Sequence, residues 1–279
     1  MRTISVVGIG SGDPGHLTVQ AIAELNAADV VFMMDKGQER HELIDVRKQI
    51  CDRYITGGTR IVTAADPPRD RTAEAYAAAV ADWRSRRAGV YERLITAELG
   101  EDGRGAFLAW GDPAFYDSTL HILRDVLARG QVSFAIRVIP GISSVQALAA
   151  QHQISLTRTG RPLHITTGRR LAAEGFPVNA DDVVVMLDAR AAFTAADGDD
   201  EIYWGAYVGT ADEILISGRV RDVAARITAE REAARERHGW IMDTYLLRRA
   251  SAGEPGSSDG EPAFDPAAGG IGPEPEPRG

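Results

Sequence analysis

The tripeptide Gly-Asp-Pro occurs twice in this chain, and its position limits the possible folds more than any other feature. The first copy, Gly12–Pro14, follows the apolar run Ile4–Ile9 across a glycine-rich loop, and the second, Gly111–Pro113, directly follows Ala106–Trp110. Short apolar runs that end in Gly and Pro indicate buried strands followed by tight turns. A helical pattern of apolar residues comes after each copy, so each predicts a unit of strand, turn and helix.

A third unit has the same order with a different turn. The run Phe134–Ile139 is followed by Pro140-Gly141, and Ser143 or Ser144 can cap the next helix. Strands that alternate with helices predict a parallel sheet, to which Val30–Met34 adds a further strand. The carboxyl ends of parallel strands share one edge, where open α/β sheets bind ligands. We therefore expect the three glycine-rich loops to converge on a ligand site.

The pattern changes after about residue 160, where strands predominate. The five further strand candidates are Leu163–Thr167, Asp182–Leu187, Glu201–Val208, Glu213–Val220 and Trp240–Leu247. Short turns between several of them predict a mixed or antiparallel α/β layer. The expected fold class is α/β with two domains. Residues 1–157 would carry the mainly parallel sheet and residues 158–250 the mixed or antiparallel layer.

Two segments depart from this pattern. Residues 36–100 are predicted to form a long, mainly helical insertion in the first domain. Residues 251–279 contain thirteen Gly or Pro residues and few apolar ones, so they cannot offset the entropy of ordering. We expect this tail to be disordered.

Charge and cysteine content restrict the class of partner and the compartment. The net charge is −9, but the last 29 residues contribute −5 of it, from six acids and one arginine, which leaves −4 for the rest. A mildly acidic body without a basic stripe disfavours nucleic acid. Cys51 is the only cysteine and no histidine pair has ligand spacing, so we expect neither a disulfide nor a metal. No apolar run reaches the roughly 20 residues that span a bilayer, and we expect a soluble, cytoplasmic protein.

The first glycine loop also matches a dinucleotide-binding pattern. Gly10–Gly15 reads G-x-G-x-x-G, and Asp35 follows its last glycine by twenty residues. In a dinucleotide-binding turn the helix begins at the third glycine, whereas here Pro14 precedes that glycine and Thr18 is a better helix cap. The match therefore favours a coincidence over a pyrophosphate site, and an NAD-dependent oxidoreductase is kept as the alternative.

Basic residues recur along the predicted helix that follows residue 36. Arg40 and Arg47 are seven residues apart, as are His41 and Lys48. Such a face is commonly solvated, and a second interpretation is a patch for a ligand rich in carboxylates.

Five ordered segments together resemble a known family, the tetrapyrrole methylases, which are S-adenosylmethionine-dependent enzymes of cobalamin and sirohaem synthesis. The segments are GIGSGDPGHLT (8–18), WGDPAFY (110–116), VIPGISSV (138–145), VVVMLDA (183–189) and YVGTADEILISGRV (207–220). The form of the first motif, the reading WGDPAFYDST and the helical insertion are most similar to the deacetylating methyltransferases of the family. Another member that acts on a different precorrin is the alternative.

The resemblance implies two α/β domains with S-adenosylmethionine in the cleft between them, no metal, and a homodimer. The cofactor-binding residues that it implies are Ser11, Trp110, Gly111, Asp112, Phe115, Ser143, Ser144, Met186, Gly209 and Thr210. Many relatives have proline where this chain has Ser11, so the first loop is expected to differ in shape.

The resemblance further implies a reaction on a small tetrapyrrole. The sulfonium methyl would pass to ring carbon 1 of precorrin-5, with release of acetate and S-adenosylhomocysteine. Loss of the acetyl group needs an activated water, for which Asp13, Asp35 and His41 are open candidates. Arg40, Arg47 and Lys48 would bind the carboxylates of the substrate.

Overall fold

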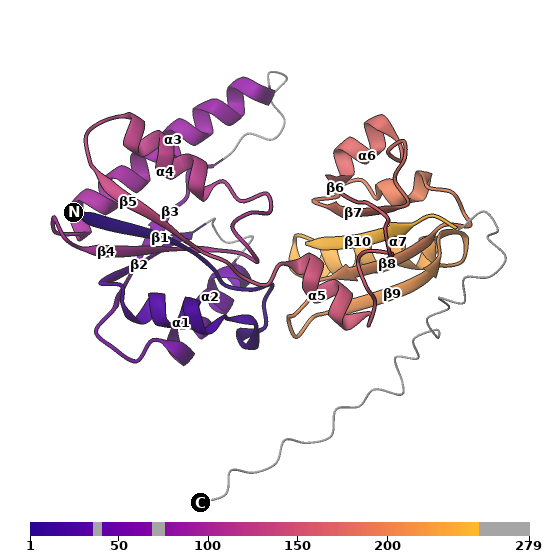
Figure 1. Cartoon of the computed structure of the whole chain (residues 1–279), viewed down its shortest axis with the longest axis horizontal. Coiled ribbons are helices and arrows are strands. Elements are labelled where there is room, and N and C mark those ends of the chain that lie inside the picture. Colours follow the sequence, from indigo (N-terminus) through magenta and orange to yellow (C-terminus); the bar gives the residue numbers. More distant parts are fainter. Residues whose placement is uncertain (36–40, 69–75, 251–279) are drawn as a thin grey trace, which may run out of the picture.

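The structure is a computed structural model, which describes residues 1–35, 41–68 and 76–250; for residues 41–43, 76 and 77 it describes the backbone alone. The described chain forms two five-stranded sheets in two lobes (Figure 1). The predicted tail, 251–279, lies outside the described residues, as do residues 36–40 and 69–75 of the predicted insertion.

The first sheet is parallel throughout and has the order β3-β2-β4-β1-β5. Its strands are β1 (Arg2–Gly8), β2 (Val30–Asp35), β3 (Arg60–Ala65), β4 (Arg104–Ala109) and β5 (Phe134–Ile139). The helices that accompany it are α1 (Val19–Asn26), α2 (His41–Tyr54), α3 (Tyr76–Glu98) and α4 (Thr119–Ala128). Figure 1 shows α1 and α2 on one face and α3 and α4 on the other.

Both faces of this sheet are buried because its strands alternate apolar residues between two cores. Ile4, Val6 and Phe32 pack with the side of α3 and α4, and Val7 and Met33 pack with that of α1 and α2. The sequence pattern did not predict β3, an edge strand whose residues are exposed or half-buried. This strand lies within the segment that was expected to be mainly helical.

The second sheet is mixed and has the order β6-β7-β10-β8-β9. Its strands are β6 (Leu163–Thr167), β7 (Asp182–Met186), β8 (Glu201–Ala206), β9 (Ile214–Arg219) and β10 (Asp243–Arg248), and all five lie at predicted positions. Only β6 and β7 pair in parallel; the other pairs are antiparallel. The two sheets confirm the predicted α/β fold class.

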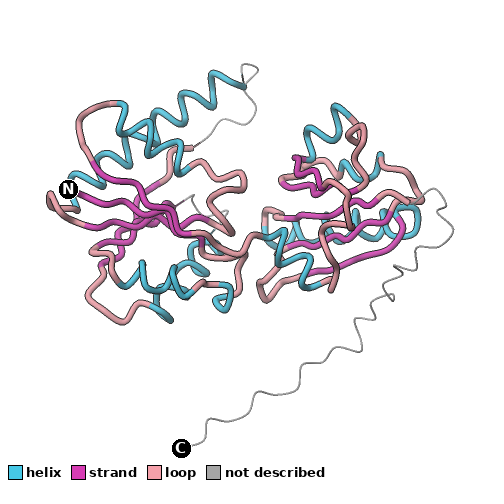
Figure 2. The backbone as a smooth tube through the Cα atoms, viewed as in Figure 1, coloured by secondary structure: helices cyan, strands magenta, loops and turns pink. Residues whose placement is uncertain are grey.

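The second sheet is covered by α5 (Ser144–Gln151), α6 (Gly168–Glu174), α7 (Val220–His238) and the short 3-10 helix η3 (Ala192–Ala195). Helix α5 directly follows the first sheet, yet its Val145 packs with Val184 and Leu246 of the second. The tube in Figure 2 shows this passage of the chain between the lobes. The loops after β4 and β5 are therefore held close to the second sheet.

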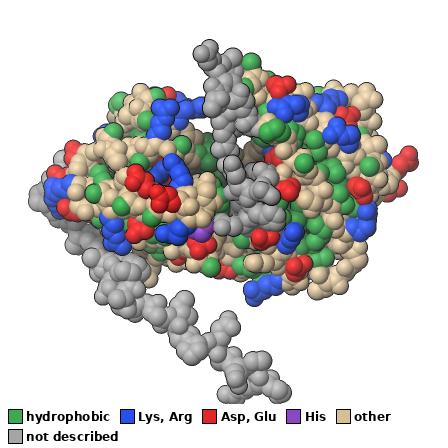
Figure 3. Space-filling view, turned by 180° about the vertical axis from the view of Figure 1, so that it is seen from behind, with side chains coloured by type: hydrophobic (Ala, Val, Ile, Leu, Met, Phe, Trp, Pro, Cys, Tyr) green, Lys and Arg blue, Asp and Glu red, His purple; other side chains and the backbone are tan. Residues whose placement is uncertain are grey.

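The surface has no broad field of one charge sign on the face seen in Figure 3, where Lys and Arg are interspersed with Asp and Glu. Among the described helices, none is long and apolar enough to cross a membrane.

Candidate active site

Three loops at the carboxyl edge of the first sheet meet through glycine. We call Gly8, Gly10, Gly111 and Gly141 the glycine junction. Gly10 and Gly111 form an isolated bridge in which each N–H donates to the other carbonyl, at 3.2 and 2.7 Å. A Cβ on Gly8 would lie 2.6 Å from the Gly141 nitrogen, and one on Gly141 would overlap the Gly111 carbonyl oxygen. The predicted convergence of these loops is thus a packing of backbone on backbone, which leaves no room for a side chain at Gly8 or Gly141.

Asp112 ties two of these loops together. Its Oδ2 accepts the N–H of Gly141 at 2.8 Å, and its Oδ1 accepts that of Ala114 at 2.7 Å. The backbone N–H of Phe115 donates to the Asp112 carbonyl at 3.1 Å. Both carboxylate oxygens thus serve the shape of the loop, so Asp112 positions the site.

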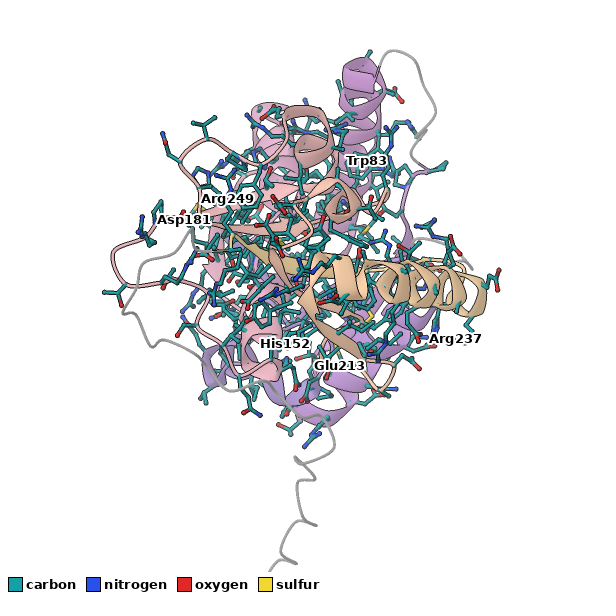
Figure 4. All side chains as sticks on the ribbon, turned by 90° about the vertical axis from the view of Figure 1, so that its right-hand side faces the viewer. Trp83, His152, Asp181, Glu213, Arg237 and Arg249 are labelled. Carbon is teal, nitrogen blue, oxygen red and sulfur yellow. The ribbon has the colours of Figure 1, made fainter. Side chains whose placement is uncertain are left out.

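The first glycine loop also meets the second sheet. Gly209 has φ +85°, and a Cβ there would lie 2.8 Å from Ser11 Oγ. The Gly209 N–H donates to the carboxylate of Glu213, labelled in Figure 4, and the Thr210 hydroxyl donates to the Tyr207 carbonyl. The structure therefore brings the loop that contains Ser11 next to Gly209 and Thr210, which belong to the other half of the sequence.

The start of α5 joins the same neighbourhood. Ser143 accepts from the Gln146 N–H and forms a capping box, so Ser143 is the cap of the two that the sequence offered. A Cβ on Gly111 would lie 3.5 Å from the Ser143 Cα atom. Met186 is half-buried at the end of β7 and packs in one cluster with Val145. Met186 is thus connected to the other predicted cofactor residues through α5, because it packs with Val145 of that helix.

The loop Gly10–Gly15 does not start a helix at its third glycine. Asp13 instead caps a single 3-10 turn, η1 (Pro14–His16), by accepting the Gly15 N–H. Thr18 then caps α1 by accepting the Ala21 N–H, as predicted. Since Gly10 is paired with Gly111, this loop has the sequence of a dinucleotide fingerprint without its geometry.

A cavity of about 610 Å³ opens at the same edge. Its lining from the first lobe includes Met34, Trp83, Trp110, Tyr116 and Asp117, and Leu187 joins it from the end of β7. Trp83, labelled in Figure 4, belongs to α3. The cavity thus receives residues from both lobes.

Two of the lining residues have strained backbones. Tyr116 has φ 52° and Leu187 φ 55°, the left-handed region that bulky residues seldom occupy. Their exposed fractions are 49% and 61%, so two large apolar side chains face solvent at one cavity. Strain of this kind persists where the surrounding structure enforces it, and it gathers at ligand sites.

Four charged residues that line the cavity form what we call the charged wall: Arg47, Asp66, Arg87 and Asp117. Arg47 and Arg87 are buried, and Arg87 Nε lies 2.9 Å from Asp66 Oδ1. Burial lowers the pKa of Arg47, while the charge of Asp117 acts in the opposite direction. Burial also raises the pKa of Tyr91, which lines the same cavity, to about 12, so its hydroxyl stays protonated.

The predicted substrate and catalytic residues lie in different places. Arg47 lies in the charged wall, 5.8 Å from the Trp110 ring, whereas Lys48 is exposed on α2. A common basic face is therefore wrong for this pair, because neighbouring residues on a helix point about 100° apart. Arg40 lies outside the described residues, and so does the side chain of His41, the first residue of α2.

The two other candidates for the base do not line the cavity among the described residues. Asp13 is exposed in the η1 turn, and Asp35 is half-buried at the end of β2, where its carbonyl accepts the Asp66 N–H. Asp66, Arg87 and Asp117 line it instead, and the sequence interpretation missed all three. The one local signal is Asp117-Ser118-Thr119 at the start of α4, since Ser, Thr and Asp are residues that commonly cap helices. The bond that forms there runs from the Thr119 N–H to Asp117 Oδ1, at 2.7 Å.

Comparison with known proteins gives consistent results. The family model for Tetrapyrrole (Corrin/Porphyrin) Methylases matches residues 3–224. The chain is 54% identical over 253 residues to a Sinorhizobium protein named precorrin-6A synthase [deacetylating], an alignment that covers 90% of this chain and 97% of that one. A crystal structure of a cobalamin-synthesis-related protein from Corynebacterium diphtheriae superposes with a TM-score of 0.78 at 38% identity, covering 89% and 98% of the two chains. Uroporphyrin-III C-methyltransferase from Thermus thermophilus, crystallised with S-adenosylhomocysteine, has the same fold, with a TM-score of 0.53 at 18% identity over 88% and 92% of the chains.

Proposed function

The chain belongs to the tetrapyrrole methylases, and from this membership we propose that it transfers a methyl group from S-adenosylmethionine to a corrin precursor. The acceptor is precorrin-5, the methylated atom is ring carbon 1, and acetate leaves from that carbon. The observation that carries this proposal is the 54% identity, over nearly the whole of both chains, to a precorrin-6A synthase.

The residues at the carboxyl edge fit S-adenosylmethionine, which supplies an electrophilic methyl group when bound. The Trp110 indole Nε1 is buried and has no hydrogen-bond partner among the described residues, so it can donate to a ligand. The glycine junction presents backbone without side chains, which suits a close approach to a flat ligand. The residues proposed to hold the cofactor are Ser11, Trp110, Gly111, Asp112, Phe115, Ser143, Ser144, Met186, Gly209 and Thr210.

The protein's contribution to methyl transfer is mainly positioning and exclusion of water. A reduced macrocycle is an electron-rich carbon nucleophile, so alignment with the methyl group matters more than activation. The apolar and aromatic lining, with Trp110, Tyr116 and Leu187, supplies a surface against which a macrocycle can lie. The buried Arg47 places a cation at the same cavity.

Two measurements test the proposal. Calorimetry should show binding of S-adenosylhomocysteine, and mass spectrometry should show loss of the acetyl group and gain of one methyl when the full chain acts on precorrin-5. A thermal-shift titration with NAD in place of S-adenosylhomocysteine tests the oxidoreductase alternative. A shift with NAD alone would contradict the proposal, and methylation of a different precorrin would move it to another member of the family. A homodimer and a cytoplasmic location are further expectations, and sedimentation tests the first.

A further inference from the structure

The charged wall has a composition that methyl transfer does not need. Transfer of a methyl group to a reduced ring requires no general base, yet two carboxylates and two guanidinium groups line this cavity. Charged groups are costly to remove from water unless they are paired or meet a ligand. The members of the wall therefore differ in a property that matters for chemistry, namely how their charged groups are bound by other residues of the protein.

Asp66 and Arg87 support one another within the wall. Their side chains are 5% and 9% exposed, and the closest atoms are 2.9 Å apart. Arg87 also donates through Nη1 to Ser118 Oγ at 3.0 Å, and its guanidinium lies over the Trp83 and Tyr91 rings. A carboxylate held in this way is a poor proton acceptor. We assign Asp66 and Arg87 to positioning.

Asp117 differs from Asp66 in burial and in the use of its oxygens. It is half-buried, and its Oδ1 accepts the Thr119 N–H at the first turn of α4. Its other oxygen has no hydrogen-bond partner among the described residues. Because Asp117 lines the cavity next to the strained Tyr116, that oxygen is available to a water molecule or ligand there.

Arg47 is a buried cation that lines the cavity together with Asp117. It is 8% exposed, lies 5.8 Å from the Trp110 ring, and lines the same cavity. The charged or titratable groups that act on it are Asp117, Tyr91, Arg87 and Asp66, in that order of effect. A carboxylate with a free oxygen and a buried guanidinium at one cavity are the two groups that hydrolysis of a carbonyl requires.

We propose that Asp117 and Arg47 form the acetyl-cleavage site of this enzyme, with Asp117 as the general base for water and Arg47 as the stabiliser of the oxyanion. This inference rests on the function proposed above. Asp117 accepts a proton from water as its oxygen attacks the acetyl carbonyl, and Arg47 binds the oxygen that becomes negative. The bond between ring carbon 1 and the acetyl carbon then breaks, its electron pair passes into the macrocycle, and acetic acid leaves and ionises.

The ring carbon left by this step is the nucleophile that takes the methyl group. Water supplies the added oxygen, two protons are released overall, and no oxidant or reductant is needed. Both steps act on one carbon, so the two sites must adjoin. The loop 110–118 meets this need because it belongs to both sites. Gly111 is part of the glycine junction and Asp112 accepts the N–H of Gly141. Tyr116 and Asp117 line the cavity.

Asp117→Asn and Arg47→Gln test the proposal in the full chain with precorrin-5 and S-adenosylmethionine. Asn keeps an oxygen for the Thr119 N–H, so α4 keeps its cap. We expect kcat for acetate release to fall about 10²-fold to 10⁴-fold in Asp117→Asn and about 10²-fold to 10³-fold in Arg47→Gln. The rate of methylation should fall together with that of acetate release, while the KM for precorrin-5 and the Kd for S-adenosylhomocysteine stay within about threefold of the wild-type values. In water labelled with ¹⁸O the wild type should place the label in acetate.

The matched controls are Asp125→Asn on α4 and Arg53→Gln on α2, both outside the cavity lining. Each should retain wild-type rates. As a second readout, added acetate should inhibit the wild type and inhibit Arg47→Gln less, with acetamide as the neutral comparison.

The outcomes separate the two proposals. A wild type that releases neither acetate nor S-adenosylhomocysteine from precorrin-5 overturns the proposed function. An active wild type with unchanged kcat in Asp117→Asn overturns Asp117 as the base. A raised KM with unchanged kcat in Arg47→Gln makes Arg47 a carboxylate clamp and overturns its part in the cleavage.

Discussion

The glycine junction and the charged wall lie at the same edge of the same sheet, and they are built in opposite ways. The junction is backbone against backbone, with two hydrogen bonds between Gly10 and Gly111 and no titratable group of its own. The wall is made of charged side chains that come from α2, the residue after β3, α3 and the loop before α4. The comparison suggests that one region fixes the position of ligands, while the other carries out acid and base chemistry.

The largest effect should come from Gly141→Ala, which attacks the junction directly. Its Cβ would overlap the Gly111 carbonyl oxygen and lie 2.8 Å from a Gly8 backbone carbon, and backbone atoms cannot rotate away. We expect a loss of at least about 3 kcal/mol in unfolding free energy, with loss of S-adenosylhomocysteine binding. Urea denaturation and calorimetry measure the two effects.

Gly57→Ala is the matched control, because no heavy atom lies within 4 Å of a Cβ built there. It should leave both stability and binding unchanged. If Gly141→Ala behaved like Gly57→Ala, close packing of the loops would not be what fixes the cofactor site.

The same contrast explains how far the sequence alone could predict the site. Thr18 and Ser143 act on neighbours within a few residues, so their roles as helix caps can be predicted locally. Asp66, Arg87 and Asp117 become part of one cavity only where four separate segments of the chain meet. One of these segments follows β3, a strand that the sequence pattern did not predict. The helix that contains Arg47 and Lys48 was correctly predicted, but which of them is buried depends on the loop containing Trp110.

The next largest effect should come from Asp112→Ala, which removes the two hydrogen bonds of the Asp112 carboxylate and leaves the residues of the glycine junction unchanged. The N–H groups of Gly141 and Ala114 would lose a charged acceptor, at a cost of about 2–3 kcal/mol. We expect the Kd of S-adenosylhomocysteine to rise about tenfold or more by calorimetry. Asp102→Ala, at an exposed pair with the N-terminus, is the control and should leave stability and binding almost unchanged. Equal affinity in Asp112→Ala and the wild type would mean that the cofactor does not depend on this loop.

Leu187→Gly should separate stability from function at a strained position in the cavity lining. Glycine relieves the left-handed backbone and little burial is lost, so unfolding free energy should stay constant or rise by up to about 1 kcal/mol. The acceptor should lose an apolar contact, and we expect KM to rise about threefold to tenfold. Val178→Gly, at an exposed aliphatic side chain without positive φ, should instead lose stability and keep KM. A destabilised Leu187→Gly enzyme with normal KM would remove Leu187 from the site.

The smallest effect concerns the buried network that holds the Leu187 loop, and it should appear as a pH dependence that the glycine junction cannot have. Arg231 donates to the Asp188 carbonyl and pairs with Asp243, and Tyr245 donates to Asp188 Oδ2 at 2.7 Å. Burial raises the pKa of Asp243 to about 6, despite the opposing charge of Arg231.

The sign of the Asp243 effect follows from proton binding. Between pH 4 and 6 the folded chain holds a proton on Asp243 that the unfolded chain has released, so this group's contribution to stability falls as pH rises through that window. Asp243→Asn should be less stable, because Arg231 loses its charged partner, and its stability should lack this decline. Urea denaturation at a series of pH values measures the difference in slope between the two proteins. Equal slopes would mean that Asp243 is ionised throughout the window, and that the network holding Leu187 is as indifferent to pH as the glycine junction.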